Sequence, residues 1–207
     1  MIKIERTGIF NMENAVRGAR NAMNSWGNMD SRTEPDGTFV FGNADLELMT
    51  KLCAAGSSHR KFMRQIFVSA DITAPLYWWK EYDTYKVGTT ANSQSTMHKL
   101  HAKPITPADF SHDKLRGASL DAILALIEVM ESLRLEYIKT KDKSLWYALI
   151  QLLPSSYRQM RTCTMSYENL VSMRRDRLGH KLEEWRVFCE WIESLPYANP
   201  LIFKPEP

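Results

Sequence analysis

The stretch 72–98 reads ITAPLYWWKEYDTYKVGTTANSQSTMH and is the most informative part of this chain. Thr73, Ala74 and Pro75 suit a helix cap and first turn, because proline is tolerated where its missing N–H would be unpaired anyway. We therefore predict a helix over 74–86. The loop after it is rich in threonine, asparagine, serine and glutamine, side chains suited to holding phosphates and a polar heterocycle.

Large aromatic side chains lie at helical spacing along this predicted helix. They are Trp78, Tyr82 and Tyr85, with Leu76 and Trp79 beside them. A stripe of this kind is typical of a hydrophobic core or a subunit interface, and less often of a cofactor-binding surface. We therefore interpret the stripe as core or interface.

Outward from this stretch, hydrophobic periodicity predicts an α+β fold. The predicted strands lie at 2–10, 38–41 and 62–72, and the predicted helices lie at 12–25, 45–55, 120–140, 143–152, 166–177 and 182–195. Ser119 is expected to cap the longest helix, whose wide apolar face suits packing on more than one side. The chain has no internal repeat and no break in composition, so we predict a single domain over 1–207.

Composition and charge place the chain among ordinary soluble proteins. Apolar residues make up 44% of the sequence, charged residues make up 25%, and the formal net charge is +3. This mild positive charge favours anionic ligands but falls short of the dense basic stripe that nucleic-acid binders carry. A nucleic-acid-binding module is therefore the least supported class of function.

Cysteine usage and hydropathy point to the cytoplasm. Cys53, Cys163 and Cys189 are odd in number and widely spaced, which is typical of reduced, buried thiols. The N-terminal MIKIERTGIF has charges within its apolar part, unlike a signal peptide. No apolar run reaches the roughly 18 residues that a membrane span requires. We expect a soluble, cytoplasmic protein without membrane contact.

Familiar catalytic and metal motifs are missing from the sequence. His98, His101 and His112 are candidate metal ligands, but neither HExxH nor CxxC is present, so exposed or capping histidines are favoured and no metal is predicted. The sequence also lacks GxGxxG, Walker and GxSxG motifs, so a Rossmann dehydrogenase, a P-loop NTPase and an α/β hydrolase are not supported.

The basic run RRDR occupies 174–177. Arg174 and Arg175 are typical of a solvated helix face. Arg177 lies one turn from the apolar Met173, so we expect it at the end of the helix and facing inward. An arginine placed in this way suits bidentate binding of a carbonyl or a phosphate.

A set of residues follows an ordered pattern over most of 10–197. It consists of His59 before a predicted strand, Ala74-Pro75 after it, Thr84-Tyr85-Lys86 and Thr89, then Asn92 and Ser95, then Leu153-Pro154, and finally Arg177. This order resembles that of the flavin-dependent thymidylate synthase family. The resemblance implies one α+β domain with a small antiparallel sheet and a helical bundle, thymidylate synthase-complementing-protein-like.

The resemblance also implies an activity and partners. The reaction would be reductive methylation of dUMP, or of a related pyrimidine nucleotide, with FAD as cofactor and with methylenetetrahydrofolate and NADPH as co-substrates. His59, Lys86 and Thr89 would touch the flavin. Ser95 would contact the nucleotide, and Arg177 would polarise the uracil ring. Members of the family are homotetramers with active sites between subunits, so a homo-oligomer is expected.

Several positions depart from the family pattern. Thr84 and Tyr85 replace two cationic or titratable residues of its motif. A glutamate and two arginines are replaced by Ser93, Met97 and Ile150. Each lost charged hydrogen bond to a phosphate or carbonyl forfeits ~1.5–3 kcal/mol. Two hypotheses therefore stay open: a divergent enzyme, and a catalytically inactive homologue that binds nucleotide or flavin as a structural oligomer.

Overall fold

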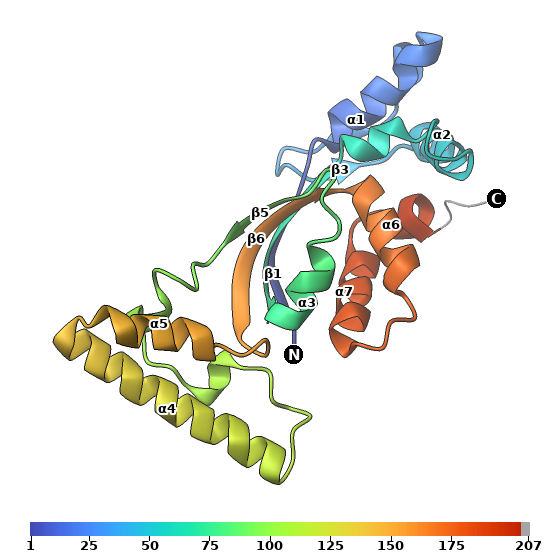
Figure 1. Ribbon diagram of the computed structural model, residues 1–207. Coiled ribbons are helices and arrows are strands. Elements are labelled where there is room, and N and C mark those ends of the chain that lie inside the picture. Colours follow the sequence, from blue (N-terminus) through green and yellow to red (C-terminus); the bar gives the residue numbers. More distant parts are fainter. Residues whose placement is uncertain (204–207) are drawn as a thin grey trace. The chain divides into compact units, whose positions relative to one another are not determined.

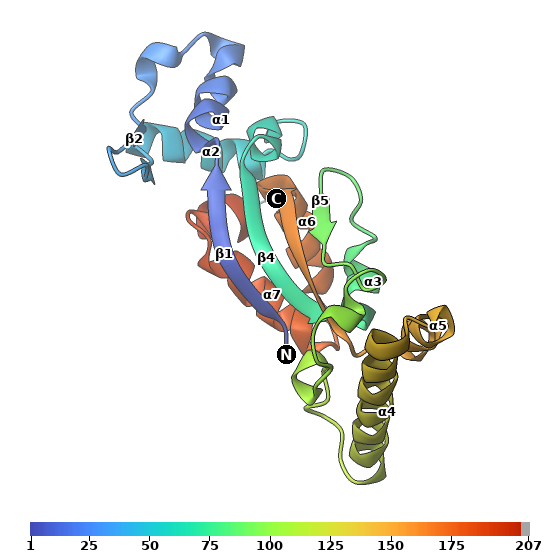
Figure 2. The same ribbon diagram turned by 90° about the vertical axis from the view of Figure 1, so that its left-hand side faces the viewer.

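Four strands form the main sheet of the fold, in the order β1-β4-β6-β5. In the computed structural model, which describes residues 1–203, they are β1 (Lys3–Phe10), β4 (Phe67–Pro75), β6 (Arg158–Ser166) and β5 (Thr90–Ser93). The sheet is small and antiparallel, and helices make up much of the remaining chain (Figure 1, Figure 2), so the predicted α+β class is confirmed.

Two predicted strands of the main sheet are present in the structure. β1 lies where a strand was predicted. In β4 the buried Val68, Ala70 and Ile72 alternate with half-buried polar residues, as the period of two predicts. The predicted start of β4 was too early, because Lys61–Arg64 form a 3-10 turn instead. Strands β5 and β6 were not predicted.

A short hairpin is built around the Pro-Asp-Gly turn that the sequence indicates. β2 (Arg32–Thr33) pairs antiparallel with β3 (Phe39–Val40), and Thr33 lies opposite Phe39. Gly37 in the connecting turn has φ +86°, a conformation that glycine adopts without steric cost. The strand predicted over 38–41 is confirmed as β3.

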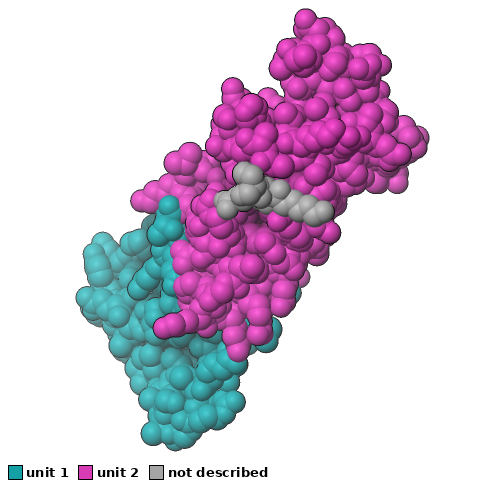
Figure 3. Space-filling model, turned by 90° about the vertical axis from the view of Figure 1, so that its right-hand side faces the viewer, with its two compact units in different colours: residues 1–3, 72–84, 92–162 teal, residues 4–71, 85–91, 163–207 magenta. Residues whose placement is uncertain are grey.

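The chain divides into two compact units, coloured teal and magenta in Figure 3. Unit 1 comprises residues 1–3, 72–84 and 92–162, and unit 2 comprises residues 4–71, 85–91 and 163 onward. The single domain over 1–207 stays a prediction.

Helix α3 (Leu76–Tyr82) of unit 1 begins later than predicted. Ala74 and Pro75 continue strand β4, because a residue before proline is biased away from the helical region. The backbone N–H groups of Leu76 and Tyr77 donate to the carbonyls of Tyr157 and Ser155, at 2.9 and 3.0 Å, which takes the place of a side-chain cap.

The aromatic stripe of α3 is buried. Trp78, Trp79 and Tyr82 are almost fully buried. The rings of Trp78 and Trp79 have centroids 4.9 Å apart, and that of Tyr82 lies 5.2 Å from each of them. The interpretation of this stripe as core is confirmed for these three residues. Tyr85 lies beyond the end of the helix.

Helices α4 (Ala118–Thr140) and α5 (Lys143–Leu152) form an antiparallel hairpin in unit 1 (Figure 1). They pack over a cluster of buried residues: Leu100, Ile105, Phe110, Ile127, Met130, Leu149 and Tyr157. Val129 and Leu135 on the outer face of α4 are 51% and 54% exposed. Within the described residues α4 therefore packs along one side only, and the prediction of packing on more than one side was wrong.

Ser119 does not cap α4. Gly117 occupies the N-cap position with φ 51°, a conformation that suits glycine. The hydroxyl of Ser119 instead accepts from the backbone N–H of Arg116 at 3.1 Å and donates to its carbonyl at 2.7 Å. The predicted extent of the helix was correct to within two residues, but the predicted cap was not.

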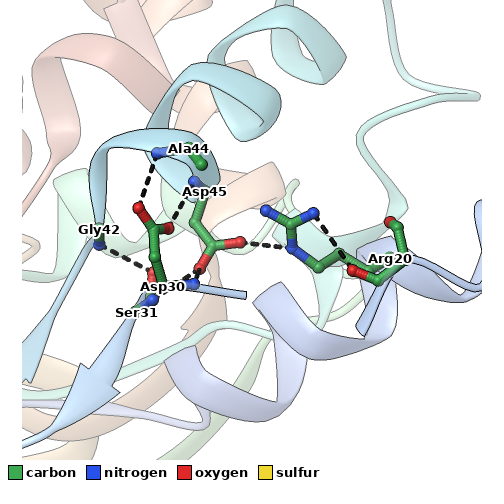
Figure 4. A network of polar contacts seen from close by, with 7 residues as sticks. Arg20, Asp30, Ser31, Gly42, Ala44 and Asp45 are labelled. Carbon is green, nitrogen blue, oxygen red and sulfur yellow. Dashed lines mark hydrogen bonds and ion pairs between the residues drawn. The ribbon is translucent and has the colours of Figure 1, made fainter. Parts of the chain in front are cut away.

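In unit 2, α1 (Met12–Ala19) and α2 (Asn43–Ala54) are joined by a buried polar network (Figure 4). Arg20 follows α1 in a 3-10 turn, and its Nε donates to Oδ1 of the fully buried Asp45 at 2.6 Å. The other oxygen of Asp45 accepts from the backbone N–H groups of Asp30 and Ser31. Hydrogen bonds from the backbone N–H groups of Ala44 and Asp45 lower the pKa of the Asp30 carboxyl.

Two further helices complete unit 2. They are α6 (Tyr167–Arg177) and α7 (Glu183–Ser194), as predicted. Ser166 caps α6 through a reciprocal capping box with Asn169. Trp191 of α7 donates from its indole nitrogen to the hydroxyl of Thr7 on β1 at 3.0 Å. Among the described residues, no helix combines the length and apolar character needed to cross a membrane.

Candidate functional site

Arg177 ends α6 within unit 2 and faces inward, as predicted. Its Nε donates to the hydroxyl of Tyr85 at 3.0 Å. Its guanidinium carbon lies 4.6 Å from the ring centroid of the buried Trp185 and 5.5 Å from that of Tyr85. The guanidinium is therefore fixed at one edge by a hydrogen bond and on its plane by an aromatic ring.

The two preceding arginines differ from each other. Arg175 is exposed and pairs with Asp176 at 3.1 Å, which confirms its place on a solvated face. Arg174 does not lie there, because it pairs with Glu193 of α7 at 2.9 Å and lies 4.1 Å over the ring of Phe203. The prediction for Arg174 was wrong, since the period of a helix alone does not show where a second helix packs.

Tyr85 connects Arg177 to a carboxylate. Its hydroxyl donates to Oδ2 of Asp176 at 3.4 Å while it accepts from Arg177. Burial raises the pKa of Tyr85, and the hydrogen bond from Arg177 opposes this shift. The phenol is therefore neutral at physiological pH and can make both hydrogen bonds at once.

The segment that carries Tyr85 is tied to itself and to the start of α6. The Thr89 hydroxyl donates to the Tyr85 carbonyl, and the Asn169 amide donates to the Val87 carbonyl at 2.7 Å. Gly88 has φ +76°, and a Cβ at this position would lie 3.0 Å from Oδ1 of Asn169. The Lys86 side chain is exposed. Unit 2 thus brings Thr89 and Lys86 onto the segment that holds Arg177.

His59 is exposed in the segment after α2. It lines a cavity of about 380 Å³ in unit 2, together with Ser58, Lys61 and Gln65. A second cavity in unit 2, of about 390 Å³, lies beside the first turn of α1 and holds none of the predicted site residues.

Arg60 anchors the segment of His59, and no sequence pattern indicated this role. Its Nε and Nη2 donate to the two carboxylate oxygens of Glu168 in α6, at 2.9 and 3.2 Å. The two partners lie 108 residues apart in sequence. Nearby, burial raises the pKa of the Cys53 thiol to about 12, and the charge of Arg60 opposes this. Cys53 is therefore an unreactive thiol, in line with the predicted buried cysteines.

Ser95 belongs to unit 1, in the loop after β5. Its hydroxyl accepts from the backbone N–H of His98 at 2.9 Å. The loop is fixed at Gln94, whose N–H donates to the carbonyl of Met160 and whose carbonyl accepts from the side chain of Gln159. Thr89 and Arg177, by contrast, belong to unit 2, where both contact Tyr85.

Arg161 supports this loop through Gln159. Its Nε donates to the side-chain oxygen of Gln159 at 2.9 Å, and its Nη1 pairs with Asp83 at 2.7 Å. Its guanidinium also lies 4.2 Å over the ring of Trp79. These contacts give Arg161 a structural role in unit 1.

The candidate metal ligands are used in other ways. His112 contacts the carbonyl of Phe110 through Nδ1 at 3.0 Å, and the ring of His101 packs edge-on against Tyr137. Within residues 1–203, no group of three His, Cys, Asp or Glu side chains is placed to hold a metal ion.

Comparison with known proteins gives a structural likeness only. No protein-family model and no curated protein sequence matches the chain. Two structures of Helicobacter pylori ThyX, a flavin-dependent thymidylate synthase complexed with FAD and dUMP, superimpose with TM-scores of 0.71 at 14% identity. The match covers 98% of this chain and 97% of that chain in one of them, and 99% and 100% in the other.

A third similar structure is a UMP/dUMP methylase, PolB from Streptomyces cacaoi, bound with 5-Br dUMP. Its TM-score is 0.63 at 14% identity, over 98% of this chain and 95% of that chain. An identity this low shows the fold alone. The chain therefore has the fold of the flavin-dependent thymidylate synthases.

Proposed function

We propose that this protein is a flavin-dependent methylase of dUMP, or of a related pyrimidine nucleotide. It would use FAD, methylenetetrahydrofolate and NADPH. The observation that carries the proposal is Arg177, held at the end of α6 by Tyr85 and Trp185. The proposal is supported by the fold, which is similar to that of proteins whose structures contain FAD and dUMP.

The chemistry suits a fixed arginine. Methylation at a uracil ring places developing negative charge on a ring carbonyl oxygen, and a preorganised cationic donor stabilises such charge. Arg177 is the candidate for this donor, and Ser95 is the candidate for a further nucleotide contact. A bound flavin would supply the redox chemistry itself.

The residues of unit 2 fit a phosphate-bearing flavin. His59, Ser58 and Lys61 line a cavity whose size suits part of such a ligand, and they offer a hydroxyl, a cation and a ring nitrogen. Lys86 would add a second cation from its exposed position. Because Thr89 donates its hydroxyl proton to the Tyr85 carbonyl, it would meet the flavin as an acceptor. FAD would thus be held by His59, Lys86 and Thr89.

A second candidate function follows from the same segment. Thr84 and Tyr85 stand where the family carries cationic or titratable residues, and Tyr85 faces Arg177. A protein that binds flavin or nucleotide but no longer turns over would keep this arrangement. In both cases we propose a cytoplasmic homo-oligomer, a tetramer by the same resemblance.

A ligand panel tests the proposal. We expect the melting temperature of the purified protein to rise with FAD and to rise again with dUMP, because a ligand that binds only the native state stabilises it. FMN, other pyrimidine nucleotides and folates complete the panel. Colourless protein that gains no stability from FAD or dUMP would refute the flavoprotein. NADPH oxidation that depends on both dUMP and methylenetetrahydrofolate distinguishes the enzyme from the inactive homologue.

A further inference from the structure

We propose that Tyr85 is the positioning residue that orients the guanidinium of Arg177 toward the nucleotide. The inference rests on the proposed function, since it assigns a task to a neighbour of the proposed nucleotide-binding arginine. Tyr85 itself need not touch the ligand. Its task is to hold Arg177 in one conformation before the nucleotide arrives.

The contacts of Arg177 leave its side chain little freedom. The Tyr85 hydroxyl accepts from Nε at 3.0 Å, and the ring of Trp185 lies 4.6 Å from the guanidinium carbon. The hydrogen bond fixes the Nε edge and the ring fixes the plane. An arginine that is ordered in advance loses less entropy when it binds, so each of its hydrogen bonds contributes more to affinity.

The direction of the phenolic O–H is also set. The hydroxyl donates to Asp176 at 3.4 Å, so a lone pair of the oxygen faces the Nε–H of Arg177. The charge of Asp176 is paired with Arg175 at 3.1 Å. Asp176 therefore fixes the rotation of the phenolic O–H. The oxygen of Tyr85, oriented in this way, then accepts from Nε of Arg177.

A neutral partner suits this task better than a carboxylate. A carboxylate that accepts from Nε would cancel the positive charge that a uracil carbonyl or a phosphate requires. Tyr85 accepts the same hydrogen bond without contributing a charge, because a phenol with an ordinary pKa of about 10, which burial raises here, is protonated at neutral pH. The contact with Tyr85 thus orients the guanidinium and leaves its charge in place.

The backbone brings the phenol to this position. The Thr89 hydroxyl donates to the Tyr85 carbonyl, and Asn169 donates to the Val87 carbonyl at 2.7 Å. Asn169 belongs to the first turn of α6, and Arg177 ends the same helix. One helix therefore holds both the segment that carries Tyr85 and the arginine that Tyr85 orients.

The decisive experiment compares the full-length wild type with Tyr85→Phe, which keeps the ring and removes the acceptor. A matched control is Tyr197→Phe in the same unit, whose hydroxyl accepts from the Phe41 N–H at 3.2 Å and donates to the Phe39 carbonyl at 3.4 Å. Two quantities are measured: the water exchange of the Arg177 Nε–H by NMR without ligand, and the Kd for dUMP by calorimetry. Arg177→Lys assigns the NMR signal.

We expect slow exchange of the Arg177 Nε–H in the wild type and in Tyr197→Phe, and fast exchange in Tyr85→Phe. Tyr85→Phe should also bind dUMP about tenfold more weakly, which corresponds to ~1.4 kcal/mol. Its affinity for FAD should stay unchanged.

Each contrary result has its own meaning. An Arg177 signal that exchanges equally fast in all three proteins overturns the inference. So does a Kd for dUMP that is the same in Tyr85→Phe as in the wild type, or that falls equally in Tyr197→Phe. A wild type that shows slow exchange and no dUMP binding refutes the proposed function while Tyr85 still holds Arg177.

Discussion

Two arginines of unit 2 are held in opposite ways. Arg20 is 5% exposed and donates to a carboxylate of Asp45 that has no exposure at all. Arg177 is half-buried and donates to the neutral phenol of Tyr85. In the first pair two charges cancel inside the protein, and in the second the phenol that accepts from Nε brings no charge.

The difference separates a structural from a functional arginine. The carboxylate of Asp45 also accepts hydrogen bonds from the backbone N–H groups of Asp30 and Ser31. Removing this carboxylate would leave the charge of Arg20 and these two donors without their acceptor. Arg177 ends a helix and is held by side chains from a loop and from α7. Loss of Arg20–Asp45 should therefore destabilise the fold, and loss of Arg177 should affect binding.

Asp45→Ala should have the largest effect on stability. Removing one partner of a buried ion pair leaves the other charge buried without compensation, so we expect a loss of about 3–5 kcal/mol in the free energy of unfolding. Urea denaturation measures it. The control is Glu47→Ala in the exposed pair with Lys51, which should cost less than ~1 kcal/mol. Equal losses in both variants would contradict a special role for the network.

Arg177→Ala should show the opposite pattern. The melting temperature should change little, while the affinity for dUMP should fall by about 1.5–3 kcal/mol, the value of a charged hydrogen bond. Calorimetry and thermal shift measure the two quantities. Arg186→Ala, in the exposed pair with Glu190 on α7 and 65% exposed, is the matched control and should bind dUMP like the wild type. A similar affinity in both variants would remove Arg177 from the proposed site.

Gly88→Ala tests the segment that carries Tyr85. The φ of +76° is strained for alanine, and its Cβ would lie 3.0 Å from the side chain of Asn169, so we expect a loss of about 1–2 kcal/mol in stability. Gly179→Ala is the control, because Gly179 has open space around it and no positive φ. A Gly88→Ala variant as stable as the wild type would show that this segment adapts freely.

The sequence predicted the elements whose burial is periodic. Helices α1, α2, α5, α6 and α7 and strand β4 bury residues at their own period. Strand β6 was missed because its buried face carries the polar Gln159, whose carbonyl accepts from the Trp79 indole at 3.0 Å. Strand β5 is exposed at all four residues, so it offered no hydrophobic pattern.

The candidate site could be predicted only in part. The inward position of Arg177 follows from its place one turn after Met173. Tyr85, however, was assigned to a helix that in fact ends at Tyr82, where the N–H of Asp83 bonds back to the carbonyl of Trp79. Its contact with Arg177 joins residues 92 positions apart. Such long-range pairs depend on tertiary packing, which local periodicity does not report.

The smallest expected effect is a change in stability at high pH. It arises from Tyr85, the phenol that accepts from Arg177, and has no counterpart in the carboxylate of Asp45 that accepts from Arg20. Burial raises the pKa of Tyr85 above its ordinary value, so the folded state holds the phenolic proton more tightly than the unfolded state. This contribution to stability is fully present below about pH 10 and is lost as the pH rises through the folded pKa. Burial also raises the pKa of Tyr157 and Tyr167, so the wild type should lose stability in this range for more than one reason.

The difference between wild type and Tyr85→Phe isolates the one phenol. We expect the free energy of unfolding of the wild type, minus that of the variant, to be constant from pH 7 to about 10 and to decrease above it. Urea denaturation at a series of pH values measures this difference. Parallel curves across the whole range would mean that the phenol of Tyr85 is not buried. A decrease above pH 10 would mean that the folded state holds the phenolic proton of Tyr85 more tightly than the unfolded state, as expected for a part-buried neutral phenol that accepts from Arg177.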